Sequence, residues 1–176
     1  MKTTTTLALT SLSVLLLAAF TIKEQPAPLR PSVEPSSYLA EIHGDLHVST
    51  RGEAKFGLVE AGAGSPAVFT LSLGANGSDG SVLFTRTNGT RFVPGTYSIG
   101  GRDDGSDEIV ALVMTGSASR PTGVFRGKSG YLIVTSASDH VIRGRFQVDG
   151  TGFLASNPDD ESRPIRATGM FTATRQ

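Results

Sequence analysis

Two segments near the C-terminus place a glycine two residues before a phenylalanine, and this repeat most constrains the fold. They read VIRGRFQVDG from residue 141 and IRATGMFTATR from residue 165. Side chains of a β-strand alternate between its two faces, so each glycine shares a face with the phenylalanine. A glycine leaves a notch that an aromatic ring can fill, and it permits strong twist. We therefore predict two strands that pack one face into a core, through Ile142, Gly144, Phe146 and Val148 and through Ala167, Gly169, Phe171 and Ala173.

The rest of the chain after Tyr38 has a similar β character, with turn clusters such as GANGSDG, TNGT and GGRDDGSD between the alternating segments. The 21 glycines and 38 % hydrophobic residues suit short strands joined by turns better than a helical core. We predict an all-β fold, an antiparallel β-sandwich or open barrel of about 8–10 short strands. The expected strands are Ala40–Val48, Ala54–Glu60, Ala67–Leu73, Ser81–Arg86, Thr96–Ile99, Glu108–Thr115, Gly130–Ser136, Val141–Asp149 and Ile165–Thr174.

The N-terminus begins with an uncharged run over residues 3–22, whose apolar part has the length of a secretory signal. The run is also long enough, at about 20 residues, to span a bilayer as a hydrophobic helix. We expect residues 1–22 to be either a cleaved signal peptide or a retained transmembrane anchor. The chain beyond it is then exported, to the periplasmic side of the cytoplasmic membrane or as a secreted protein. Residues 23–37 are rich in proline and are expected to form a linker before one β-domain over 38–176.

The C-terminal half, GYLIVTSASDHVIRGRFQVDG followed by a loop and RATGMFTAT, resembles a loose group of uncharacterised bacterial secreted and lipid-anchored β-proteins. Those proteins similarly end in paired G-x-F strands, often after a central G-T-Y like Gly95–Tyr97. The resemblance covers most of Tyr38–Gln176 and implies export and an all-β domain, with no catalytic residues to transfer. This chain lacks the cysteine of the lipid-anchored members.

Composition and motifs exclude several classes of function. A formal net charge of zero argues against nucleic-acid binding, which usually needs a strongly basic face. The absence of cysteine excludes disulfide scaffolds, thiolate metal sites and a cysteine nucleophile. The chain has neither the serine nucleophile elbow nor a Walker loop, so we predict no catalytic residues and no cofactor.

The stretch EIHGDLHVS is the most suggestive for metal binding. On a single strand Glu41, His43, Asp45 and His47 all point the same way. Three of them along one strand cannot share an ion, but His43 with Asp45, or Asp45 with His47, could do so with further ligands from another strand. The alternative is a solvated strand face. The acidic turns at 76–80 and 157–161, and another at 103–108, offer oxygen ligands for calcium, but Asx residues are also simply favoured in turns.

Arginine supplies twelve of the 16 basic residues. Arg143 and Arg145 lie on the strand face opposite Phe146, and Arg166 falls on the corresponding face of the second G-x-F strand. If these strands pair, the three arginines form a patch that suits an acidic protein surface or lipid head groups. The alternative is ordinary surface charge.

These features together predict a non-catalytic, exported domain. We expect it to be a structural or accessory subunit of a membrane protein complex at its periplasmic face, for which a respiratory or photosynthetic assembly is a natural host. The alternative is a free secreted module that binds carbohydrate or another small ligand, against which the absence of tryptophan weighs. A hydrolase without a recognisable motif is the third hypothesis.

Overall fold

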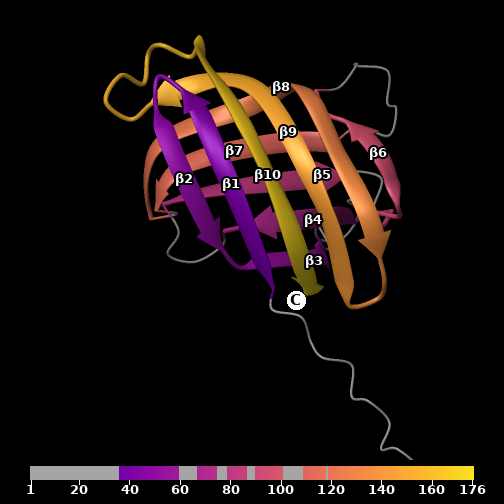
Figure 1. The fold of residues 1–176 in the computed structure, drawn as a ribbon. Coiled ribbons are helices and arrows are strands. Elements are labelled where there is room, and N and C mark those ends of the chain that lie inside the picture. The colour runs from indigo at the N-terminus through magenta and orange to yellow at the C-terminus, as the bar shows by residue number, and fades with distance from the viewer. Residues whose placement is uncertain (1–35, 60–66, 75–78, 87–89, 101–108, 118) are drawn as a thin grey trace, which may run out of the picture. The chain divides into compact units, whose positions relative to one another are not determined.

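The computed structural model describes residues 36–59, 67–74, 79–86, 90–100, 109–117 and 119–176. Within these ranges every helix or strand is a β-strand, which confirms the all-β prediction (Figure 1). The ten strands are β1 (Ser37–Gly44), β2 (His47–Gly52), β3 (Ala54–Val59), β4 (Val68–Leu73), β5 (Gly80–Arg86), β6 (Gly95–Ser98), β7 (Ile109–Ser117), β8 (Arg120–Ala137), β9 (Val141–Leu154) and β10 (Arg163–Arg175).

The predicted N-terminal helix, and the linker up to residue 35, lie outside the described residues. Among the residues that are described, no helix is long and apolar enough to cross a membrane.

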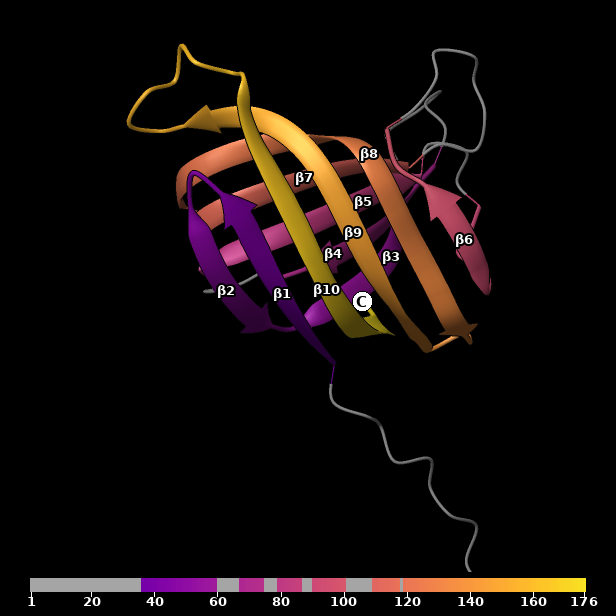
Figure 2. The ribbon, with the colours of Figure 1, turned by 45° about the horizontal axis from the view of Figure 1, so that its top comes forward.

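The strands form two layers whose directions cross steeply (Figures 1 and 2). The front layer runs β2–β1–β10–β9 and then the second half of β8, with β6 at its edge. The rear layer runs β3–β4–β5–β7 and then the first half of β8. At its C-terminal end β10 makes a short parallel pairing with β3, so the pairings return from β10 to β3 and close the sheet on itself.

A bend in β8 carries that strand from the rear layer to the front one. Its first residues pair with β7, its later residues pair with β6, and the register against β9 shifts between Gly127 and Ser129. Just beyond the shift Gly130 has φ 127°, and a Cβ there would lie 2.1 Å from the carbonyl oxygen of Gln147. Only glycine fits this bend. The predicted strand Gly130–Ser136 is therefore the second half of an 18-residue strand.

The two G-x-F segments are neighbouring antiparallel strands, and their glycines and phenylalanines pair reciprocally. Gly144 lies opposite Phe171, and Gly169 lies opposite Phe146. A Cβ on Gly144 would come within 2.8 Å of the Phe171 ring, and one on Gly169 within 2.7 Å of the Phe146 ring. Both rings are buried, with 4 % and 2 % of their surface exposed. The predicted seating of a ring over a glycine notch is confirmed, and each ring uses the glycine of the partner strand.

Contacts from the front layer to the rear layer fill the core. The Phe146 ring meets Phe84 of β5 edge-on, with 5.3 Å between ring centroids. The Tyr38 hydroxyl lies 2.6 Å from the Gly80 carbonyl oxygen, to which it donates a hydrogen bond, and 2.8 Å from the Thr50 hydroxyl. These buried hydrogen bonds tie β1 and β2 to β5, because a buried hydroxyl is costly without a partner.

The segment Ala40–Val48 is two strands and not one, so that prediction was wrong. β1 ends at Gly44, and β2 begins at His47 after a tight turn. Gly44 is the last residue of β1 that pairs with β10, and its partner Ile165 lies two residues after the start of that strand. Gly44 also approaches β10 so closely that a Cβ would lie 2.4 Å from the Pro164 carbonyl oxygen. The chain reverses after Gly44, and His43 comes to lie opposite His47.

Replacing Gly169 with alanine tests the paired notches. The new Cβ would meet the Phe146 ring and also the Leu39 carbonyl oxygen, at 2.5 Å, so the strands must separate. We expect Gly169→Ala to lower the free energy of unfolding by about 1–3 kcal/mol in urea denaturation. Gly95→Ala is the matched control, because its Cβ would meet no heavy atom nearer than 4.0 Å, and we expect a change below about 0.5 kcal/mol. Equal losses in both variants would contradict this packing.

Candidate functional site

The outer face of the front layer carries a continuous row of apolar and basic side chains. Strand register aligns the row across six strands, because residues paired on neighbouring strands share a face. Leu39 and Met170 are directly paired and have 46 % and 64 % of their surface exposed. In order from β2 to β6 the row is Arg51, Leu39, Met170, Arg145, Ile133 and Thr96.

Two shallow hollows lie on this face, and both are lined by Leu39, Met170 and Arg145. The larger, of about 490 Å³, extends toward Arg143 and the backbone of Gly144. The smaller, of about 340 Å³, extends the other way along the strands, where Glu41 and Tyr131 are part of its lining. We call this surface, from Arg51 to Ile133 with Arg143 and Tyr131 beside it, the front groove.

The predicted arginine patch is divided by the structure. Arg143 and Arg145 are at outward-facing positions of β9 and line the front groove. Arg166 is also outward, but it lies opposite Asp149, four positions along β9 from Arg145. Its Nε donates a hydrogen bond of 2.6 Å to Asp149 Oδ1. Arg51 joins the groove in its place, and its position could not be predicted because β2 was not recognised as a strand.

The Asp149–Arg166 pair changes the ionisation of the carboxyl group. Burial opposes ionisation of Asp149, but hydrogen bonds from Arg166 and Gln147 outweigh it and hold the pKa below its ordinary value. The Gln147 amide donates to Asp149 Oδ2 at 2.9 Å. Arg166 is thus a neutralised cation next to the β1–β2 hairpin, and it contributes little net charge to the front groove.

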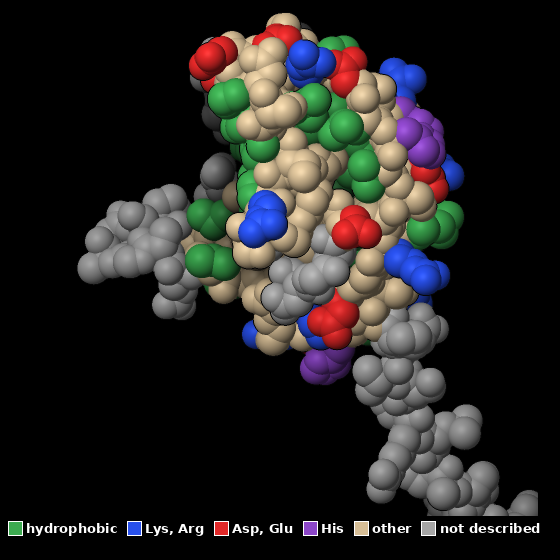
Figure 3. Space-filling view, turned by 90° about the vertical axis from the view of Figure 1, so that its left-hand side faces the viewer, with side chains coloured by type: hydrophobic (Ala, Val, Ile, Leu, Met, Phe, Trp, Pro, Cys, Tyr) green, Lys and Arg blue, Asp and Glu red, His purple; other side chains and the backbone are tan. Residues whose placement is uncertain are grey.

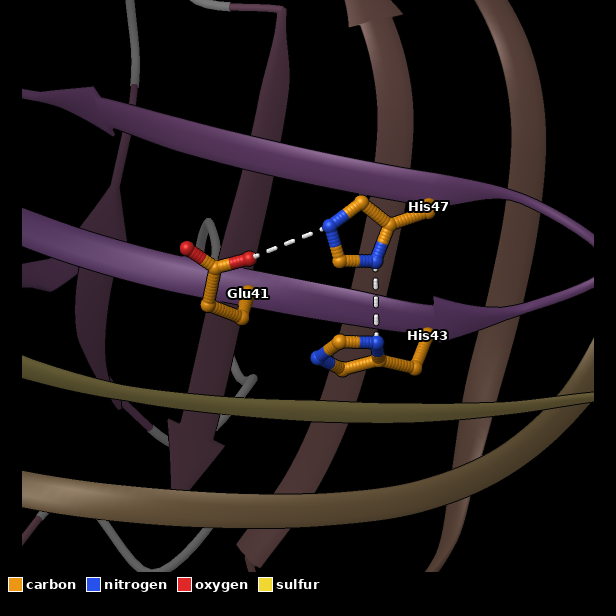
Figure 4. A group of neighbouring side chains, drawn as sticks. All are labelled: Glu41, His43 and His47. Carbon is orange, nitrogen blue, oxygen red and sulfur yellow. Dashed lines mark hydrogen bonds and ion pairs between the residues drawn. The ribbon is translucent and has the colours of Figure 1, made fainter.

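Two histidines and a glutamate gather at the tip of the β1–β2 hairpin (Figure 4). His43 and His47 lie opposite each other, with 2.9 Å between their Nδ1 atoms, and His47 Nε2 is 3.7 Å from Glu41 Oε2. Of the predicted ligands His43, Asp45 and His47, the structure therefore brings the two histidines together. Asp45, in the turn itself, instead accepts a hydrogen bond from Arg163 at the start of β10. Figure 3 shows histidine side chains at the surface with acidic and basic side chains nearby.

The predicted calcium turns are described in part. Residues 75–78 and 101–108 lie outside the described residues. In the third turn Asp160 accepts hydrogen bonds from the Ser162 hydroxyl, at 2.6 Å, and from the Ser162 backbone, and these bonds lower the pKa of its carboxyl group. This is the ordinary local role of an Asx residue in a turn.

Comparison of the chain with models of protein families, with curated proteins and with solved structures finds no match. What the site does is therefore inferred from its own residues.

Stability in acid tests the Asp149–Arg166 pair. Because the folded pKa of Asp149 is lowered, the pair stabilises the fold above the unfolded pKa of about 3.9, and this contribution is lost as the pH falls through the folded pKa. We expect Asp149→Asn to lower the free energy of unfolding at pH 7 by about 0.2–1 kcal/mol, as for other surface pairs, with a smaller difference at pH 2. Asp159→Asn, at an exposed loop position, is the control with no such effect. Urea denaturation of the wild type and the variant at both pH values measures the difference in their free energies of unfolding. If that difference is the same at pH 7 and pH 2, the ion pair is not its cause.

Proposed function

We propose that this β-domain is a non-catalytic docking module that binds a protein partner through the front groove. The observation that carries the proposal is the pairing of exposed Leu39 and Met170 beside Arg145. Single exposed apolar residues are common on protein surfaces. Here Leu39 and Met170 are adjacent on neighbouring strands, with the half-buried Ile133 on the far side of Arg145, and grouped exposed apolar side chains are typical of interaction sites.

The charges beside the groove indicate the chemistry of the partner. Arg51 is paired with Leu39 and Arg145 with Met170, and Arg143 lines the larger hollow together with both apolar residues. Arginine is enriched in protein interfaces, where its planar group binds carboxylates through two hydrogen bonds. The fitting partner is a protein surface with an apolar centre and carboxylates at its rim.

The N-terminal segment supports a partner at a membrane. The uncharged run at residues 3–22 is long enough for an anchor, and the proline-rich linker at 23–37 would act as a spacer. An anchored domain samples a small volume beside the membrane, which raises its effective concentration near a membrane-bound partner. We therefore propose an accessory subunit of a membrane protein complex, on the periplasmic side.

A free secreted module for a small ligand is the second candidate. The larger hollow, at about 490 Å³, lies within the usual range of roughly 300–1,000 Å³ for ligand pockets. It is shallow, whereas ligand pockets usually enclose most of the ligand, so the groove suits a broad protein contact better.

Replacing the two arginines that line the larger hollow of the groove tests the docking proposal. We expect the full chain to migrate in native membranes, solubilised in mild detergent, as part of a particle larger than itself. Arg143→Gln with Arg145→Gln should weaken this association about tenfold or more, because the pair removes two charged contacts that border the apolar centre of the interface. Native gel electrophoresis with detection of the chain measures the bound fraction.

Arg120→Gln with Arg126→Gln is the matched control, because it removes the same charge at two exposed positions of β8 that do not line the front groove. The control should stay in the particle. A particle that survives the groove variant and dissociates in the control would contradict docking through this face. Binding of the wild type to anionic vesicles alone would assign the arginines to lipid head groups. A soluble chain that starts near Phe20 or Ile22, with no partner, would favour the secreted module.

A further inference from the structure

The tip of the β1–β2 hairpin offers a metal site that is separate from the docking proposal. We propose that Glu41, His43 and His47 bind a divalent transition-metal ion of the Zn²⁺ class. One ligand atom from each residue can be chosen so that all three lie within 4.8 Å of one another. The turn is what makes this possible, because on one continuous strand Glu41 and His47 would lie about 20 Å apart.

Strand register presents the three ligands on one face. His43 and His47 are a directly opposed cross-strand pair, and Glu41 precedes His43 by two positions on the same side of β1. Figure 4 shows the three side chains projecting together from the hairpin. Ligand atoms about 2.0–2.2 Å from a tetrahedral zinc ion are roughly 3.4 Å from one another. The Nδ1 atoms of His43 and His47 are 2.9 Å apart, whereas the 3.7 Å contact to Glu41 uses the other nitrogen of His47, Nε2. One ion takes a single nitrogen from each ring, so the side chains must turn to bring the three ligand atoms, now within 4.8 Å of one another, to that spacing.

The donor set selects the class of ion. Two imidazole nitrogens and one carboxylate suit zinc, and His₂Glu is a set in which zinc keeps one position open. Calcium and magnesium prefer oxygen ligands only, so imidazoles disfavour them. Copper(II) and nickel(II) bind the same nitrogen donors, and geometry and availability decide among these ions.

Neighbouring cations are held by carboxylates of their own. Arg166 is paired with His43 across β1 and β10, and its Nε bonds to Asp149. Arg163 bonds to Asp45 beside the turn. Both ion pairs reduce the repulsion between these arginines and a bound dication. Because Asp45 is engaged by Arg163, Glu41 is the carboxylate that remains for the ion.

The site is accessible from solvent. The side chain of His47 is 68 % exposed and that of Glu41 is 41 % exposed. An ion therefore enters without opening the fold, and its fourth position faces outward, toward water or a donor from another molecule. Glu41 also lines the smaller hollow of the front groove, so a bound ion would lie at the edge of that surface.

Zinc titration of the full chain, without an affinity tag, tests this site. Isothermal calorimetry with ZnCl₂ should give one ion per chain, and excess Zn²⁺ should raise the melting temperature because only the folded chain assembles the site. His43→Gln, His47→Gln and Glu41→Gln should each weaken binding at least about tenfold. A Co²⁺ titration followed through its visible absorption bands gives a second readout of coordination.

Two variants make the test specific. His140→Gln removes the third histidine, which lies between β8 and β9, and should leave the affinity unchanged. Asp45→Asn should also retain binding, which distinguishes this ligand set from His43, Asp45 and His47. Circular dichroism of each variant checks that it is folded. The proposal is overturned if the wild type shows neither heat nor a melting shift, if His140→Gln abolishes binding, or if Asp45→Asn weakens it while Glu41→Gln does not.

Discussion

Two phenylalanine rings, each lying against a glycine of the neighbouring strand, join β9 to β10, and the rest of the domain depends on this contact. Phe146 packs against Gly169 and Phe171 against Gly144, at positions where a Cβ would collide with the ring. Phe146 then reaches Phe84 of the rear layer. Because strong twist and close strand approach need residues without Cβ, these glycines let a chain with few aromatic residues bury a continuous core.

The same register determines what the outer face offers. The rings and glycines of β9 and β10 occupy inward positions. Because side chains alternate along a strand, Met170, Arg145 and Arg166 occupy outward positions. A shift of the pairing register by one residue would turn the inward side chains of a strand outward. Both the core packing and the outer groove would then be lost. The pairing that places Met170 beside Arg145 also places Arg166 beside Asp149. The register that packs the core therefore also places Arg145 at the groove and Arg166 beside Asp149, next to the hairpin.

The sequence alone predicted the faces of the two G-x-F strands, because a period of two is a local property. It did not predict the hairpin, because Ile42, Gly44, Leu46 and Val48 keep the alternation through the turn. The reversal is visible only in the pairing of β1 with β2 and with β10, and the local alternation does not contain that information. The same reversal places Glu41 beside the two histidines, while Asp45 in the turn bonds to Arg163. The full length of β8 was missed because the glycines at its bend resemble a loop in the sequence.

The paired notches are tested most directly by nuclear magnetic resonance of the protein with labelled glycine and phenylalanine. We predict nuclear Overhauser contacts from the Phe171 ring to the α-protons of Gly144 and from the Phe146 ring to those of Gly169. Ring currents should shift these α-protons away from their usual positions. Unshifted glycine α-protons without contacts to either ring would contradict the account, because β9 and β10 would then be joined by another packing.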